Sequence, residues 1–268
     1  MLHIEDTPYS FVLKAIIAVT VQHHCSSPIL TTEALHLLSN DLRNQVMMEA
    51  FSNLSLRPLQ AILILSVHDL GAGRLKEYWN LVALAKRMAL QLGLRDLVAH
   101  HCRNFDRVST LPPRMLVVPD SLVEREEKIR AYWMTEVLDS ASTLGAAWNI
   151  TISKPESTGL LPCSDAAWAF PEAVISAWPF DDLATSSGYS LYVMLATNEL
   201  YHVHRFLQTS YNLYSSEERA RRREDCQSVD EGLKAWRAKF DTMQLQLNAD
   251  NGGQYDPNSI LTQCTLDL

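Results

Sequence analysis

Glycine is scarce in this chain, at 9 of 268 residues. Tight turns and phosphate-binding loops depend on glycine, so this count disfavours turn-dense β architectures and nucleotide-binding loops. The strings G-x-G-x-x-G, G-x-x-x-x-G-K-[ST] and G-x-S-x-G are all absent. The sequence therefore lacks the signatures of dinucleotide-binding, P-loop and α/β-hydrolase folds.

Cysteine is also sparse. The five cysteines are scattered and odd in number: Cys25, Cys102, Cys163, Cys226 and Cys264. Because no C-x-x-C pair occurs, neither a disulfide framework nor a zinc knuckle is expected. Free thiols in a reducing compartment are predicted instead.

Long hydrophobic runs and a positive charge excess are missing as well. The apolar stretch Phe11 to Val21 is interrupted by Lys14 and is far shorter than the ~20 residues that span a bilayer. It has no basic flank or small-residue cleavage site, so it does not resemble a signal peptide. With 31 acidic against 23 basic residues the net charge is −8, which disfavours nucleic-acid binding through overall charge. We expect no membrane partner and no direct DNA contact from this chain.

Helical periodicity is what the sequence does contain. Helices are expected over about 10–21, from Thr31 or Thr32, 56–70, 74–92, from Ser121, 190–214 and 216–247. Thr31, Thr32 and Ser121 are candidate N-caps, Pro58 suits a first helical turn, and Gly71-Ala72-Gly73 is a stop signal. No alternating strand pattern is sustained. We predict an all-α, multi-helix globular domain of packed amphipathic helices, with a long irregular connection at about 145–190.

Two helices carry sharper expectations. In segment 74–92 the polar residues form one narrow stripe, so this helix is predicted to be enclosed by others; the stripe is Lys76, Asn80, Arg87 and Gln91. In the helix after Ser121, Glu136 falls in the middle of the apolar face. A buried carboxylate there requires a partner or a raised pKa.

Candidate chemistry is weak. Asp181-Asp182 after Phe180 is similar to part of a magnesium–diphosphate site of helical terpenoid synthases, but Thr185 and Ser186 stand where a third carboxylate is needed. A capping turn is the simpler interpretation. No catalytic residue is assigned, and a cofactor-binding residue cannot be named.

The histidine pairs and the arginine-rich string do not have the spacing of a metal site or of a basic binding patch. The adjacent residues His100-His101-Cys102 cannot easily converge on one metal ion, and His202 and His204 diverge on a helix. No metal site and no cofactor are expected. The string 217–224 could be a nuclear-import or phosphate-contact patch, but its interleaved acids favour a solvated helix face.

Two segments together have a specific resemblance. The first runs from Leu59 to Asp96 and includes Gly71-Ala72-Gly73-Arg74, Tyr78-Trp79 and Gln91-Leu92-Gly93. The second contains Glu126 to Trp133, then Leu138-Asp139, Gly145, Leu161-Pro162, Asp165 and Trp168. In order and spacing they resemble the fungal-specific transcription factor domain, also called the middle homology region, of zinc binuclear cluster regulators. Phe11 to Val21 and Leu233 to Trp236 also stand where that family has similar elements.

The chain departs from the family at several places. The family's usual basic pair is reduced to Arg130-Ala131, its usual Arg is Ser140, and Glu136 replaces an apolar residue. Gly145-Ala146-Ala147 stands where Gly-Arg-Pro is typical. The six closely spaced cysteines that hold zinc in relatives have no counterpart, since Cys25 and Cys102 lie 77 positions apart. In the relatives, zinc binding and DNA recognition thus belong to a module that these residues do not contain.

The resemblance implies a nuclear transcription regulator, not an enzyme, that controls a metabolic or biosynthetic gene set. Residues 1–247 are expected to form the regulatory region, and 248–268 a loop and truncated final segment of the same domain. The implied partners are a zinc-cluster regulator, in a homo- or heterodimer, and a small-molecule effector. Three alternatives stay open: an interaction protein that dimerises with a full-length regulator, a helical metabolic enzyme, and a truncated gene.

Overall fold

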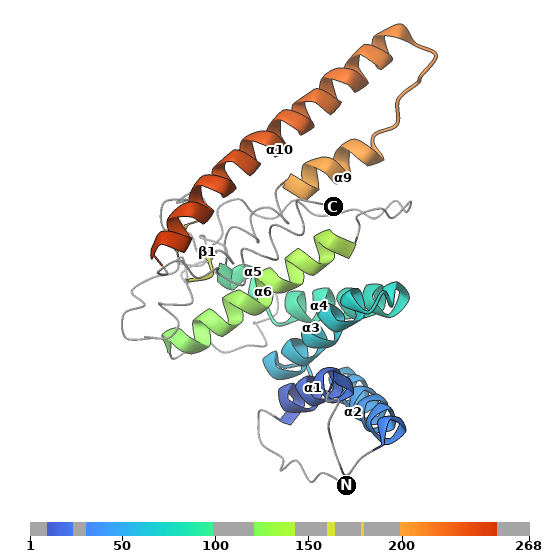
Figure 1. Cartoon of the computed structure of the whole chain (residues 1–268), viewed down its shortest axis with the longest axis vertical. Coiled ribbons are helices and arrows are strands. Elements are labelled where there is room, and N and C mark those ends of the chain that lie inside the picture. The colour runs from blue at the N-terminus through green and yellow to red at the C-terminus, as the bar shows by residue number, and fades with distance from the viewer. Residues whose placement is uncertain are drawn as a thin grey trace, which may run out of the picture. The chain divides into compact units, whose positions relative to one another are not determined.

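The protein is described by a computed structural model that covers residues 10–23, 31–98, 121–142, 160–163, 178–179 and 199–250 (Figure 1). Helices make up 86% of these residues, which confirms the predicted all-α class. The elements are α1 (Ser10–Thr20), the 3-10 helix η1 (Val21–His23), α2 (Thr32–Ser52), α3 (Leu56–Gly71), α4 (Leu75–Gln91), α5 (Leu94–Val98), α6 (Leu122–Ser142), β1 (Leu160–Leu161), β2 (Trp178–Pro179), α9 (Leu200–Gln208) and α10 (Ser216–Asp250).

The chain divides into two compact units. The first contains the described residues up to 98 together with 127–142, and the second contains 121–126 and the described residues from 160 onward. Helix α6 is therefore shared between them. The predicted irregular connection at 145–190 lies almost wholly outside the described residues. None of the described helices is long and apolar enough to cross a bilayer.

Local signals start and stop the helices of the first unit. Thr31 is the N-cap of α2, and its Oγ1 accepts a hydrogen bond from the backbone N–H of Ala34 at 3.3 Å. Helix α3 ends in a Schellman motif: the N–H of Gly73 donates to Leu70 O (3.1 Å) and that of Arg74 to Asp69 O (2.9 Å). Gly73 has a φ of +68°, a conformation that glycine adopts without strain. The predicted cap and stop are both confirmed.

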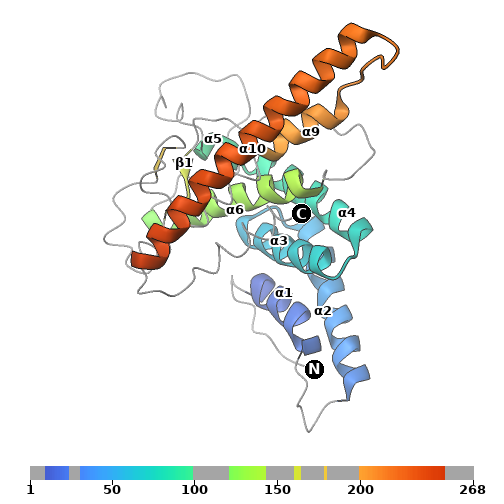
Figure 2. The same ribbon diagram turned by 45° about the horizontal axis from the view of Figure 1, so that its top comes forward.

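Helix α3 is largely enclosed within this unit. Side chains on most of its circumference are buried, and four of its apolar residues have no exposed surface: Leu59, Ala61, Ile62 and Leu65. The helices α1, α2 and α4 pack against it (Figure 2). Serine is accommodated inside this packing because the Ser66 hydroxyl donates to Ile62 O at 2.8 Å within the same helix.

The expectation that segment 74–92 is enclosed was wrong. Helix α4 buries one face, at Tyr78, Leu81, Val82, Ala85, Met88 and Ala89. Its remaining apolar residues include Leu75 and Leu90, which are 46% and 44% exposed. The buried positions recur at three- and four-residue spacing, so α4 is an ordinary amphipathic helix despite its many apolar residues. The prediction from the number of aliphatic residues alone therefore overestimated how much of α4 is buried.

Helix α6 supplies further core to the first unit. Ile129, Trp133 and Val137 have no exposed surface, as their shared face predicted. Two aromatic side chains of α4 donate hydrogen bonds to the carboxyl-terminal part of α6: Tyr78 OH to Leu138 O at 2.6 Å and Trp79 Nε1 to Ser142 O at 2.9 Å. Tyr78 and Trp79 thus pack apolar ring surface and also donate hydrogen bonds at the contact between α4 and α6.

The second unit contains the hairpin of α9 and α10, which lie side by side and run in opposite directions (Figure 1). Helix α9 ends at Gln208 rather than at Tyr214 as predicted. The chain becomes extended at the C-cap Thr209, and farther on the Asn212 carboxamide accepts a hydrogen bond from Tyr214 N–H at 3.0 Å, which forms a turn where helix was predicted. Helix α10 begins at Ser216 as expected and continues to Asp250, three residues beyond the predicted end.

Replacement of Tyr78 by Phe should remove one buried hydrogen bond and keep the ring in place. We expect Tyr78→Phe to lower the free energy of unfolding by about 1 kcal/mol. Tyr214→Phe is the matched control, since Tyr214 is 97% exposed and should leave stability unchanged. Urea titration followed by circular dichroism measures both, and equal effects of the two substitutions would contradict the role assigned to Tyr78.

Candidate functional site

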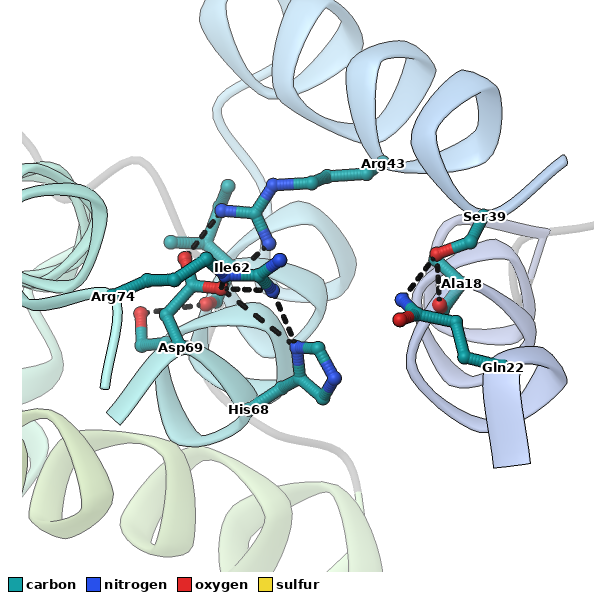
Figure 3. A network of polar contacts seen from close by, with 9 residues as sticks. Ala18, Gln22, Ser39, Arg43, Ile62, His68, Asp69 and Arg74 are labelled. Atoms are coloured by element: carbon teal, nitrogen blue, oxygen red, sulfur yellow. Dashed lines mark hydrogen bonds and ion pairs between the residues drawn. The ribbon is translucent and has the colours of Figure 1, made fainter. Parts of the chain in front are cut away.

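A buried carboxylate, Asp69, lies at the centre of the polar cluster in the first unit (Figure 3). Its side chain has no exposed surface. Arg43 of α2 binds it through both guanidinium ends, with Nη1 2.9 Å from Oδ1 and Nη2 in contact with Oδ2. Arg74 binds Oδ1 through Nε at 3.0 Å and Nη2 at 2.7 Å. The charge is therefore desolvated but fully compensated.

The local sequence explains how these groups meet. Asp69 occupies the last turn of α3, and the Schellman turn at Gly73 folds the chain back so that Arg74 returns to the same carboxylate. Arg43 follows the buried Leu42 on α2, next to the face that packs on the neighbouring helices. The cluster thus joins α2, α3 and the start of α4.

His68 extends the cluster toward α1. Its Nδ1 lies 2.7 Å from Arg74 Nη2, and because a guanidinium can only donate, Nδ1 must be the acceptor. The imidazole is then neutral and carries its proton on Nε2. Burial, and next the charge of Arg74, lower the pKa of His68 below its ordinary 6.5, while Asp69 opposes this shift. Both the contact and the pKa direction favour the neutral ring at pH near 7.

A second group of hydrogen bonds attaches α1 to α2. The Ser39 hydroxyl donates to Ala18 O at 2.7 Å, and Gln22 Nε2 donates to Ser39 Oγ at 2.6 Å. These residues and the arginine cluster border one narrow polar recess, which His68 also lines. Figure 3 shows both groups on facing sides of this recess.

An apolar pocket opens beside the polar recess. Its volume is about 410 Å³, and its lining comes from α1, α3 and α6: Val19, Leu63, Ile64, Val67, His68 and Met134. Leu63 is 5% exposed, whereas Val67 is 48% exposed. We call this cavity the His68 pocket. It can hold a small molecule, since ligand sites typically measure 300–1,000 Å³.

Glu136, singled out from the sequence, is buried as predicted and has a partner. Lys86 Nζ lies 2.6 Å from Glu136 Oε1 and 3.2 Å from Asp139 Oδ2. Burial raises the pKa of Glu136 above its ordinary 4.5, and the charge and hydrogen bond of Lys86 lower it less strongly. Glu136 therefore has both a charged partner, Lys86, and a raised pKa.

Other residues singled out from the sequence do not assemble into a site. His202 is exposed and His204 is buried, so the two diverge as predicted. The string 217–224 lies mainly exposed in the first turns of α10, which fits the solvated-face interpretation. His100-His101-Cys102 and Asp181-Asp182 lie outside the described residues. Within the described part of the chain, no group of three or more His, Cys, Asp or Glu side chains could hold a metal ion.

Sequence reasoning missed Asp69, Arg43 and Lys86. One signal for Asp69 was present, because it is the single acidic residue in an apolar helix and stands five positions before Arg74 across a glycine turn. Arg43 and Lys86 had no comparable signal. Their partners lie 26 and 50 positions away, and only the packed helices bring them together.

Comparison with known proteins addresses the chain as a whole. The model of the fungal specific transcription factor domain matches residues 18–238. The chain is 34% identical over 229 residues to the notoamide biosynthesis cluster transcriptional coactivator notQ' of Aspergillus versicolor. That alignment covers 82% of this chain and 45% of the relative, so the chain spans less than half of the relative's length. No solved structure gives a significant match.

The Asp69 cluster should contribute strongly to stability. We expect Asp69→Asn to lower the free energy of unfolding by about 3–5 kcal/mol, because two arginines lose the charge that compensates them in a buried site. Asp230→Asn is the control: Asp230 is 55% exposed and pairs with Lys234 one helical turn away, so its loss should cost about 0.5 kcal/mol or less. Chemical denaturation measures both, and similar losses would contradict the structural role of Asp69.

Glu136 should make stability depend on pH. Its raised pKa means that the folded state binds the proton more tightly than the unfolded state, so its contribution is present below about pH 4.5 and is lost as pH rises through the folded pKa. The stability of the Glu136→Gln variant, relative to that of wild type, should therefore increase as pH rises above about 4.5.

Lys86→Met tests the same pair from the other side. Removal of the opposing charge should raise the pKa of Glu136 further and make the loss of stability with pH steeper than in wild type. In the double variant Lys86→Met/Glu136→Gln, the loss of stability with rising pH should be smaller than in Lys86→Met alone. Denaturation curves across the pH range provide the measurement, and parallel pH profiles for all variants would contradict the assignment.

Proposed function

The chain belongs to the fungal specific transcription factor domain family, and from this premise we propose that it is a regulatory region that acts in the nucleus to control a biosynthetic gene cluster. The observation that carries the proposal is its 34% identity, over 82% of its length, to a protein named as a transcriptional coactivator of such a cluster. The match to the family model, over residues 18–238, includes residues of both units.

Regulation through a protein partner fits the physical properties of the chain. Its net charge of −8 opposes attraction to DNA phosphates, and the Arg-containing string at 217–224 balances its basic residues with acidic ones. A coactivator works on promoters that another protein recognises. The proposed partner is therefore a DNA-binding zinc-cluster regulator, bound as a heterodimer or through homodimers of this chain.

Deletion of the gene should lower the transcripts of one contiguous biosynthetic cluster several-fold, and the wild-type gene should restore them. Complementation with Asp230→Asn should restore them equally, while Asp69→Asn should restore them poorly because the fold is destabilised. RNA sequencing and immunoblots for protein level measure these outcomes. Transcripts that stay unchanged on deletion, under conditions where the protein is present in nuclei, would contradict the proposal.

The partner is tested separately. Chromatin immunoprecipitation of the tagged chain should enrich the cluster promoters, and the enrichment should disappear when the co-purifying DNA-binding regulator is deleted. Purified chain alone should not shift promoter DNA at physiological salt. A specific shift by the purified chain would show that it reads DNA itself and would overturn the partner-dependent part of the proposal.

A further inference from the structure

The His68 pocket lies within the first unit, at a place where three of its helices meet. Val19 of α1 and Met134 of α6 line it together with residues of α3. Leu63 and Val67 stand one turn apart on α3 and share a face, on which Leu63 is nearly buried and Val67 is half-exposed. The cavity therefore extends from the core of the unit to its surface.

The lining offers apolar surface and few hydrogen-bonding groups. Apart from His68, the described lining side chains are valine, leucine, isoleucine and methionine, and almost all of the surface that faces the cavity is apolar. The Nδ1 of His68 is already bound to Arg74, at 2.7 Å from its Nη2. A molecule in this pocket is therefore held by close packing and by removal of apolar surface from water.

The charged side chains nearby belong to the polar recess. Arg43 and Arg74 line that recess and are not among the residues that line the pocket, and both pair with the buried carboxylate of Asp69. A charged group placed in the pocket would lose its hydration and would gain no charged partner among the described lining residues. The pocket therefore selects against charge.

The size of the pocket indicates a small molecule as its occupant. A stable protein–protein interface buries about 800 Å² on each partner and takes about 20–30 residues from it. The His68 pocket provides a volume of about 410 Å³ between a few side chains, which falls within the range of small-molecule sites. Its dimensions thus suit a compact ligand and are too small for a protein surface.

We propose that the His68 pocket is an effector site of this regulatory region and that it binds an uncharged, largely apolar small molecule between α1, α3 and α6. The bound molecule contacts all three helices and stabilises their packing by mass action. The inference deepens the proposed function, on which its regulatory meaning rests. Binding itself is a property of the folded chain and is measured independently of transcription.

Two fluorescent probes with the same ring skeleton test the ligand class. N-phenyl-1-naphthylamine is uncharged, whereas 8-anilino-1-naphthalenesulfonate carries a sulfonate between its two ring systems, so that both cannot enter the pocket while the sulfonate stays in water. In titrations of the full chain, the uncharged probe should bind at one saturable site and at least tenfold more tightly than the sulfonate. Absence of a saturable site, or equal or tighter binding of the sulfonate, would overturn the proposal.

Substitutions at the rim locate the site. Val67→Trp should fill the pocket and reduce the affinity for N-phenyl-1-naphthylamine at least tenfold, with little change in melting temperature because Val67 is 48% exposed. Leu90→Trp is the control: it introduces the same side chain on α4 at a position that is 44% exposed and does not line the pocket, and it should bind as wild type does. Equal affinities of Val67→Trp and wild type would reject the pocket.

Methionine methyl resonances locate the probe in the wild-type chain, without any substitution at the site. Met134 lines the pocket, whereas Met48 of α2 is exposed and does not line it. Ring currents of bound N-phenyl-1-naphthylamine should shift the methyl signal of Met134, which Met134→Leu identifies by its loss, and should leave that of Met48 in place. An equal or larger shift at Met48 would show that the probe binds exposed apolar surface and would reject the pocket.

The site and the proposed function fail in distinguishable ways. If the uncharged probe binds as expected but gene deletion leaves all transcripts unchanged, the binding site stands and the proposed function fails. If transcripts fall on deletion but the probe does not bind, the proposed function stands and the site is rejected. Loss of the co-purifying regulator from Val67→Trp, in a chain that does not bind the probe, would identify the pocket as a protein contact instead.

Discussion

The buried charge of Asp69 is the constraint on which the first unit depends. A carboxylate without exposed surface is stable only where cations and hydrogen-bond donors compensate it, so the helix that carries Arg43 and the turn that carries Arg74 must both be in place. The same contacts fix the tautomer of His68. Helix packing, turn geometry and the chemistry of the adjacent pocket therefore follow from one desolvated group.

The two buried carboxylates among the described residues of the first unit are compensated in opposite ways. At Asp69 two guanidinium groups serve one carboxylate, whereas at Glu136 the carboxylates of Glu136 and Asp139 share the ammonium of Lys86. Among the side chains in direct contact, the first cluster thus has a positive surplus and the second a negative one. The raised pKa of Glu136 reflects the incomplete compensation at the second cluster, because burial outweighs the attraction of Lys86.

Features that depend on neighbouring residues could be predicted from the sequence. The helical class, the cap at Thr31 and the stop at Gly71-Ala72-Gly73 depend on periodicity and turn chemistry within a few residues, and all are confirmed. The resemblance to the fungal transcription factor domain is confirmed by the match over 18–238. The burial of α4 was overestimated because a helix with many apolar residues does not specify which of them its neighbours cover.

The candidate site was less predictable because it is made of contacts between distant parts of the chain. The need for a partner at Glu136 could be deduced from its place on an apolar face, but the identity of Lys86, 50 positions earlier, could not. Arg43 and the His68 pocket likewise exist only once α1, α2, α3 and α6 have packed. The Schellman turn at Gly73 has a consequence for chain entropy. It closes the Asp69–Arg74 contact over five residues, so the loop-closure cost of this contact is smaller than that of the Arg43–Asp69 contact, which spans 26 positions.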